Sequence, residues 1–113
     1  MAEEQTNLIS IEEFARIDIR IGKIVDVEII PKSDKLFKLI IDIKERKIQC
    51  VAGIREYYSE GDLKGRLIPV IINLKPAKLR GVVSEGIILA AQDKNSVRFL
   101  TPESEVEIGA KVR

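Results

Sequence analysis

The 113-residue sequence predicts a small all-β domain, and three observations support this fold class. Apolar residues alternate with charged ones over several stretches, which is the period-two pattern of half-buried strands. Clusters of Gly, Pro, Ser, Asp and charged residues separate these stretches and supply turns. A short segment with helical spacing interrupts the strands after the third one. The length suits one domain that buries its own core.

The N-terminal residues are expected to form an arm and a short helix. Residues 1–9 are polar and predict a flexible arm, so that the folded domain covers residues 10–113. Ser10 and Glu13 have the spacing of a capping box, in which each side chain satisfies a free amide at a helix start. This predicts a helix over about 11–16 whose inward-facing residues are Ile11, Phe14 and Ala15.

The central residues predict five strands and a second short helix. Odd-numbered positions are mostly apolar from Ile17 to Ile29, so they are expected to face inward along one long strand. Gly22 permits a bulge in this strand or the strong coiling that a small barrel requires. Tyr57 and Tyr58 follow Ile54 at helical spacing, and at least one tyrosine is expected to plug the barrel end. The other predicted segments are strands over about 37–43, 47–52, 66–72 and 86–91, and a helix that begins near residue 54 and ends at Gly61.

The C-terminal residues 92–113 predict an extension beyond the barrel. Apolar positions alternate again over 97–101 and 106–112, with a turn at Pro102, so a C-terminal hairpin is expected. This extension offers more apolar surface than a five-stranded barrel needs. We therefore expect it to contribute to a dimer interface through Val97, Phe99, Val106, Ile108 and Val112.

The order of these elements predicts one architecture among small β domains. Three strands, a short helix and two further strands form the order of the OB-fold, a five-stranded Greek-key barrel that binds oligonucleotides. Another small barrel, or a sandwich with an incidental helix, is the alternative.

The composition argues against catalysis and against a metal or cofactor. The chain has no histidine, which removes the commonest metal ligand and the side chain best suited to proton transfer near neutral pH. Its one cysteine, Cys50, excludes an intramolecular disulfide and is expected to be a small core residue. The sequence has neither a signal peptide nor an apolar run long enough for a membrane span. We therefore expect a cytoplasmic protein that is not an enzyme.

The charges are unevenly distributed although the formal net charge is only +1. Residues 32–80 hold 12 Lys and Arg against 6 acidic residues, and the remaining residues are acidic on balance. The segment NLKPAKLRGVVSEG, residues 73–86, carries three cations and no acid before its Glu85. Such a segment is either a solvated connection between two core strands or a surface that reads phosphates. Charge alone favours the solvated connection.

The segment NLKPAKLRGVVSEGIILAA also carries a family resemblance. Together with FARIDIRIGKIVDVE (14–28), SDKLFKLIIDI (33–43) and VAGIREYY (51–58), it resembles the EMAP II-like tRNA-binding domain. The motifs follow one another in the family's order and spacing over about residues 10–113. This resemblance implies an OB-fold without catalytic activity that reads the L shape of tRNA. It also implies a homodimer and association with methionyl-tRNA synthetase.

The resemblance implies that the basic segment 73–86 is part of a tRNA-binding site. OB-fold ligands also lie across strands 2 and 3, where the resemblance supports Ser33 and Lys35, and Lys38 is added because it faces outward. The predicted tRNA-binding residues are Ser33, Lys35, Lys38, Asn73, Lys75, Lys78, Arg80 and Ser84. Pro76, Gly81 and Gly86 are expected to shape the backbone. A CsaA-like chaperone or protein-interaction module on the same fold is the alternative function.

Overall fold

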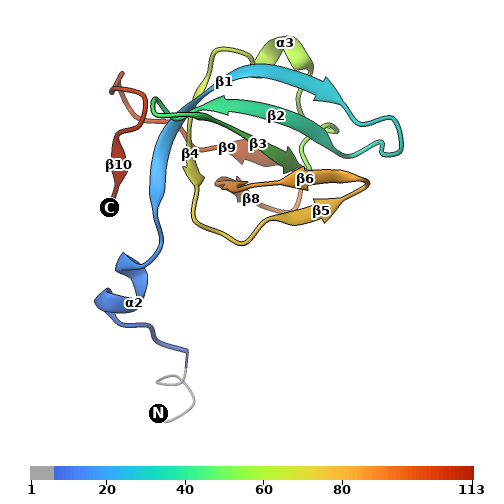
Figure 1. The fold of residues 1–113 in the computed structure, drawn as a ribbon. Helices are drawn as coiled ribbons and strands as arrows, with labels where there is room; N and C mark the ends of the chain where they lie inside the picture. Colours follow the sequence, from blue (N-terminus) through green and yellow to red (C-terminus); the bar gives the residue numbers. More distant parts are fainter. Residues whose placement is uncertain (1–6) are drawn as a thin grey trace.

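A computed structural model describes residues 7–113, so most of the predicted N-terminal arm lies outside the described residues (Figure 1). In this part of the chain the helices are α2 (Ile11–Ala15) and α3 (Glu60–Leu63). The long strands are β1 (Ile19–Ile29), β2 (Phe37–Asp42), β3 (Lys47–Ala52) and β4 (Leu67–Ile71). The short strands are β5 (Ala77–Leu79), β6 (Val82–Ser84), β7 (Ile87–Ile88), β8 (Ala90–Gln92), β9 (Val97–Phe99) and β10 (Lys111–Val112).

The strands form the predicted small barrel. The main sheet has the order β3-β2-β1-β4-β7, and every neighbouring pair is antiparallel. It curls into a nearly closed five-stranded barrel with short helices, which confirms the OB-type architecture (Figure 1). The strand bounds predicted for β2 and β3 agree with the structure to within one residue.

β1 (Ile19–Ile29) bends so strongly that it pairs with three other strands. Its first half pairs with β4 and β10, and its second half pairs with β2. A register shift between Ile24 and Asp26 marks a β-bulge, which increases the local twist. The bulge does not lie at Gly22, where the sequence allowed it.

The expectation that odd-numbered residues face inward along all of β1 is wrong, because the bulge changes which side chains face the interior. Ile24, at an even position, is fully buried in the core, whereas Ile29 is 48% exposed. Ile19 and Ile21 are buried, but they lie outside the central core cluster. Ile21 lines a groove with residues of the C-terminal segment instead. In the first half of β1, before the bulge, Gly22 and Ile24 therefore face the barrel interior, and the odd-numbered residues face the other way.

The barrel interior is filled by branched aliphatic side chains from every wall. Phe37, Leu39 and Ile41 of β2 and Ile43 just after it are all buried, and Leu39 and Ile41 are completely inaccessible. Cys50 is completely buried among them, as predicted, and this burial raises the pKa of its thiol to about 12. The other fully buried large side chains are Ile24, Leu63, Ile68 and Val70.

The N-terminal helix forms as predicted but does not bury its apolar face. Ser10 Oγ accepts a hydrogen bond from the Glu13 amide, and the Glu13 carboxylate accepts one from the Ser10 amide. No residue of α2 is buried, and the helix stands away from the barrel in Figure 1. The expectation that Ile11, Phe14 and Ala15 pack inward is wrong, because these side chains only border an open hollow shared with the C-terminal residues 111–113.

The predicted second helix is displaced along the chain. The amides of Tyr57 and Tyr58 both donate to the Ile54 carbonyl, which makes a single turn rather than a helix. α3 begins only after Ser59, whose amide and hydroxyl donate to the Asp62 carboxylate. Tyr58 stacks on Phe99 with ring centroids 4.7 Å apart and packs against the core, as expected for a plug.

The C-terminal segment does not form the predicted hairpin. β9 pairs with β8, across a turn at residues 93–96, and β10 pairs with β1. Between them, the Ile21 amide donates to the Ala110 carbonyl and the Gly109 amide donates to the Ile21 carbonyl. Residues 109–112 therefore find their backbone partners on β1 and not on β9. Among the described residues, no helix has the length and hydropathy of a membrane span.

Gly22 supplies a test of the tight β1–β2 packing. A Cβ at this position would lie 2.4 Å from Ile41 Cγ2, and Ile41 is fully buried and cannot move aside. We expect Gly22→Ala to lower the free energy of unfolding by about 1–3 kcal/mol, measured by urea denaturation. Gly61→Ala is the matched control because nothing lies within 4 Å of its added methyl group. Equal stabilities of the two variants would contradict the proposed contact.

Candidate nucleic-acid interface

The basic segment 73–86 folds back on itself as a β-hairpin. β5 and β6 pair through Leu79 and Val82, which leaves Arg80 and Gly81 as the turn. Both turn residues have positive φ, 51° for Arg80 and 83° for Gly81. Positive φ at both central residues is the signature of a type I′ turn, whose twist suits a two-residue hairpin. Gly81 therefore shapes the backbone as predicted, whereas the rest of the segment is more regular than the expected loop.

The three predicted cations lie along this hairpin. Lys75 precedes β5, Lys78 is its central residue, and Arg80 occupies the turn. All three side chains are exposed, and none forms an ion pair with any residue between 7 and 113. Because Lys78 pairs with Val83, both lie on the opposite face of the hairpin from Ala77 and Leu79. The cations thus share one element without sharing one face.

The hairpin is attached to β3 by side-chain hydrogen bonds and one backbone hydrogen bond, without a strand ladder. Ser84 Oγ accepts from the Val51 amide at 3.0 Å and donates to the Gly86 carbonyl at 2.9 Å. The Gln49 amide donates to the Glu85 carboxylate, and the Glu85 amide donates to the Gln49 carbonyl, both at 2.8 Å. These bonds close the barrel between β3 and the basic hairpin.

Gly86 and the Gln49 side chain complete this attachment. A Cβ on Gly86 would lie 2.4 Å from the Ile71 carbonyl oxygen, so glycine permits the approach of β7 to β4. The Gln49 side-chain amide donates to the Val83 carbonyl at 2.7 Å. Sequence reasoning identified Gly86 but missed Gln49 and Glu85, because their roles depend on a contact between residues far apart in the chain.

The two neutral site residues predicted within residues 73–86, Asn73 and Ser84, have structural roles in this arrangement. Ser84 is only 8% exposed, and its hydroxyl already makes the two bonds described above. Asn73 is exposed, and its side chain joins the end of β4 to the start of β1. Its carboxamide oxygen accepts from the Asp18 amide at 2.8 Å, and its nitrogen donates to the Arg16 carbonyl at 2.6 Å. Direct RNA contact by Asn73 and Ser84 stays a prediction.

The remaining predicted residues lie on the β1–β2 side of the barrel. Ser33 is in the β1–β2 turn, where its hydroxyl accepts from the amide of exposed Lys35. Lys38 lies on β2 opposite Glu28, with 3.5 Å between its Nζ and the carboxylate. The Lys38 side chain is 26% exposed and that of Glu28 is 48% exposed, and a pair so accessible to solvent contributes at most about 1 kcal/mol. RNA contact by Lys38 stays a prediction.

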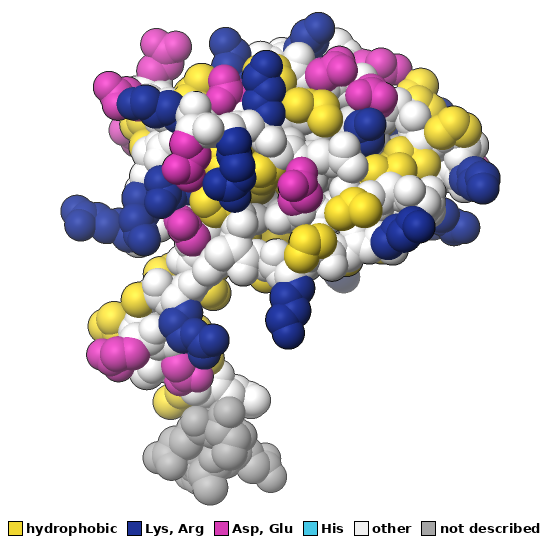
Figure 2. Space-filling view, in the orientation of Figure 1, with side chains coloured by type: hydrophobic (Ala, Val, Ile, Leu, Met, Phe, Trp, Pro, Cys, Tyr) yellow, Lys and Arg dark blue, Asp and Glu magenta, His cyan; other side chains and the backbone are white. Residues whose placement is uncertain are grey.

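The β1–β2 turn and the β5–β6 turn both point toward the right of Figure 1. In the same orientation, Lys and Arg side chains outnumber acidic ones along that edge of the surface (Figure 2). Cations gathered along one edge are the electrostatic footprint of a polyanion-binding surface.

Asp18 and Arg20 form an ion pair beside the C-terminal segment. Arg20 Nε lies 2.6 Å from the Asp18 carboxylate, and the hydrogen bond from Arg20 holds the pKa of Asp18 below its usual range. The two residues are neighbours along the same strand rather than partners across two strands. Arg20 therefore donates to Asp18 and to the Gly109 carbonyl, and it is not one of the cations of the basic edge.

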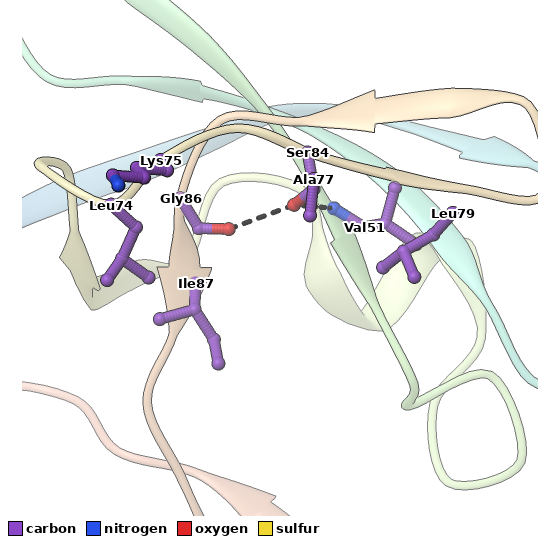
Figure 3. Close-up of a pocket in the computed structure, with 8 residues that line it drawn as sticks. All are labelled: Val51, Leu74, Lys75, Ala77, Leu79, Ser84, Gly86 and Ile87. Carbon is purple, nitrogen blue, oxygen red and sulfur yellow. Dashed lines mark hydrogen bonds between the residues drawn. The ribbon is translucent and has the colours of Figure 1, made fainter.

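The inner face of the hairpin bounds an apolar pocket of about 170 Å³ that the sequence did not reveal. Figure 3 shows Leu74 and Ile87 on one side of it and Leu79 and Val51 on the other. Lys75 lies at the edge beside Leu74. The alternation of Ala77, Lys78 and Leu79 in the sequence is compatible with a strand that has one apolar face. It indicates a pocket only when this segment is known to be a strand.

The described residues contain no cluster of three or more acidic or cysteine side chains that could hold a metal ion. The arrangement instead offers exposed cations on a rigid support, which suits phosphate binding.

Comparisons with known proteins agree with this geometry. The family model described as "Putative tRNA binding domain" matches residues 19–111. The methionine–tRNA ligase of Archaeoglobus fulgidus is 51% identical over 96% of this chain, which spans only 17% of the ligase. The solved structure of a MetRS-related protein from Pyrococcus horikoshii has a TM-score of 0.89 and 30% identity, covering 95% of this chain and 99% of its own. The chaperone CsaA from Bacillus anthracis has a TM-score of 0.84 and 29% identity, covering 94% and 99%.

Ser84 supplies a test of the side-chain closure. We expect Ser84→Ala to lower the free energy of unfolding by about 1–3 kcal/mol, because it leaves the Val51 amide without a partner. Urea denaturation measures the loss, and Ser104→Ala, at an exposed position of the C-terminal segment, is the control. A stability equal to that of the unmodified chain would show that β3 and the hairpin are held by other contacts.

Proposed function

Because the chain belongs to the tRNA-binding domain family, we propose that it is a non-catalytic protein that recognises the folded shape of tRNA. The observation that carries this proposal is the hairpin of residues 73–86, whose three cations are exposed and unpaired with any acid among the described residues. Phosphate contacts supply most of the affinity for nucleic acids, since each neutralised phosphate releases counterions.

Shape rather than base sequence is the property that this surface reads. Aromatic residues make up only 4% of the chain, and the one stacked pair described above, Tyr58 with Phe99, plugs the barrel. Stacking platforms for successive bases, the usual device of single-strand binders, are therefore not the basis of affinity. The hairpin and the β1–β2 turn present separate cations that fit phosphates on a preformed backbone path, with Ser33, Lys35 and Lys38 as the second group.

The proposed cellular role is to serve methionyl-tRNA synthetase in the cytoplasm, as a separate subunit or as a joined domain. Its support is the identity with a segment of methionine–tRNA ligases. A surface that holds tRNA without reading its bases adds affinity to a catalytic unit that does read them, because linked sites act at a high effective concentration.

A chaperone function is the second candidate, favoured by the structural likeness to CsaA and by the apolar pocket beside the hairpin. It would require capture of unfolded polypeptide that persists at moderate salt and after ribonuclease treatment. tRNA binding, in contrast, weakens steeply as salt rises.

The cations of the hairpin test the proposed tRNA site. We expect Lys75→Ala, Lys78→Ala and Arg80→Ala each to weaken tRNA binding in a filter-binding assay over a range of salt. Each change should also reduce the salt slope by about one charge, because one phosphate contact is lost. Lys64→Ala is the control, since Lys64 is exposed and follows α3, which lies at the top of Figure 1 and away from the β5–β6 hairpin. Unchanged tRNA affinity in the triple variant would exclude this site.

We also propose that the protein is a homodimer whose interface includes helix α2 and the C-terminal segment 92–113. Ile11 and Phe14 are 81% and 42% exposed, and Leu100 and Val106 are each 44% exposed. Exposed apolar side chains in such numbers are typical of association surfaces. Of the residues expected at this interface, Val97 and Phe99 instead pack against the core of their own chain.

The dimer proposal is tested by changing its apolar surface. Ile11→Asp and Val106→Asp should each shift the protein toward monomer by at least about tenfold in dissociation constant, because each removes roughly 1.5–3 kcal/mol of apolar burial. Sedimentation equilibrium measures this constant. Val83→Asp is the matched control, at a side chain that is 42% exposed on the hairpin. A stable monomer of the unmodified chain at micromolar concentration would contradict the proposal.

A further inference from the structure

The apolar pocket inside the basic hairpin has no occupant in the proposal above. Its walls include Leu74, Leu79 and Ile87, which are 46%, 43% and 47% exposed although they are large aliphatic side chains. They converge on one hollow instead of being scattered over the surface (Figure 3). Apolar surface gathered in this way, beside a charged rim, marks a place where another molecule is received.

The pocket is a consequence of how the hairpin is attached. Because β5 alternates, Ala77 and Leu79 face the barrel while Lys78 faces away from it. The Ser84 hydroxyl is already bonded to the Val51 amide and to the Gly86 carbonyl beside the pocket. The walls are thus held rigidly, and they offer apolar contact without a free side-chain hydroxyl.

The size and the charge of the site limit what it can receive. Pockets for small molecules have volumes of about 300–1,000 Å³, whereas this one has about 170 Å³, which suits one ring or one side chain. Lys75 lies at its rim, and Lys78 and Arg80 lie on the same hairpin. The Glu85 carboxylate beside it accepts from the Gln49 amide. The surroundings therefore favour a ring attached to an anionic chain.

We propose that this pocket accepts one unstacked base of the bound tRNA, with Lys75 on a phosphate next to it. The inference rests on the proposed function and adds a contact that is not electrostatic. Unpaired bases in folded RNA can be splayed out and held between apolar side chains. Because the walls carry no polar side chain free to read a base edge, the pocket holds any base whose position on the L brings it there.

Two substitutions test the pocket without touching the core. Ala77→Phe fills it, and Leu79→Ala removes one wall, and both residues are exposed on β5. We expect each variant to bind an unmodified tRNA transcript about five- to tenfold more weakly, since one base contact is lost. The salt slope should stay that of the unmodified chain, because no phosphate contact is lost. Val83→Ala is the matched control, equally exposed but on the opposite face of the hairpin.

Chemical probing identifies the base directly. One unpaired base of the transcript should be protected by the unmodified protein, and exposed again with Ala77→Phe, when dimethyl sulfate is used to probe adenine and cytosine and a carbodiimide to probe guanine and uracil. The proposed function and the pocket fail in different ways. Loss of binding in the Lys75, Lys78 and Arg80 variants, with unchanged binding in Ala77→Phe and Leu79→Ala, would overturn the pocket alone and point to an apolar side chain of a protein partner. Absence of tRNA binding by the unmodified chain would overturn both.

Discussion

The closure between β3 and the hairpin is the interaction on which the rest of this barrel depends. β3 and β6 share no strand ladder, so Ser84, Gln49 and Glu85 supply the hydrogen bonds that a ladder would otherwise make. A buried backbone amide needs a hydrogen-bond acceptor, and the Ser84 hydroxyl accepts from the buried amide of Val51. The same bonds fix the position of the basic hairpin. The same hydrogen bonds therefore stabilise the barrel and position the cations of the hairpin.

This arrangement separates two kinds of residue within residues 73–86. Ser84, Glu85 and Gly86 hold the hairpin against the barrel, and Asn73 joins the end of β4 to the start of β1. The cations Lys75, Lys78 and Arg80 extend into solvent from that support. A rigid support matters for shape recognition, because cations at fixed separations favour one backbone path over others. The surface can thus discriminate folded RNA without contacts to base edges.

The accuracy of sequence-based prediction followed the range of the interactions involved. The capping box of α2 and the strands β2 and β3 were predicted well, since local spacing and alternation determine them. The helix after β3 was misplaced, because Ser59 and Asp62 start α3 later than the tyrosine spacing suggested. The C-terminal hairpin was wrong since β10 pairs with β1, nearly the whole chain away. The tRNA-site residues rested on charge and family resemblance, and their RNA contacts remain predictions.

The sequence by itself determined the fold class, the order of the strands, the absence of histidine chemistry and the three cations of residues 73–86. These properties follow from composition and from periods of two that neighbouring residues reveal. The tertiary structure alone decided which face of β1 lines the interior, that Ser84 is buried, and that Leu74, Leu79 and Ile87 enclose a pocket. Each of these depends on a bulge or on contacts between residues distant in the chain, and no local pattern records such contacts.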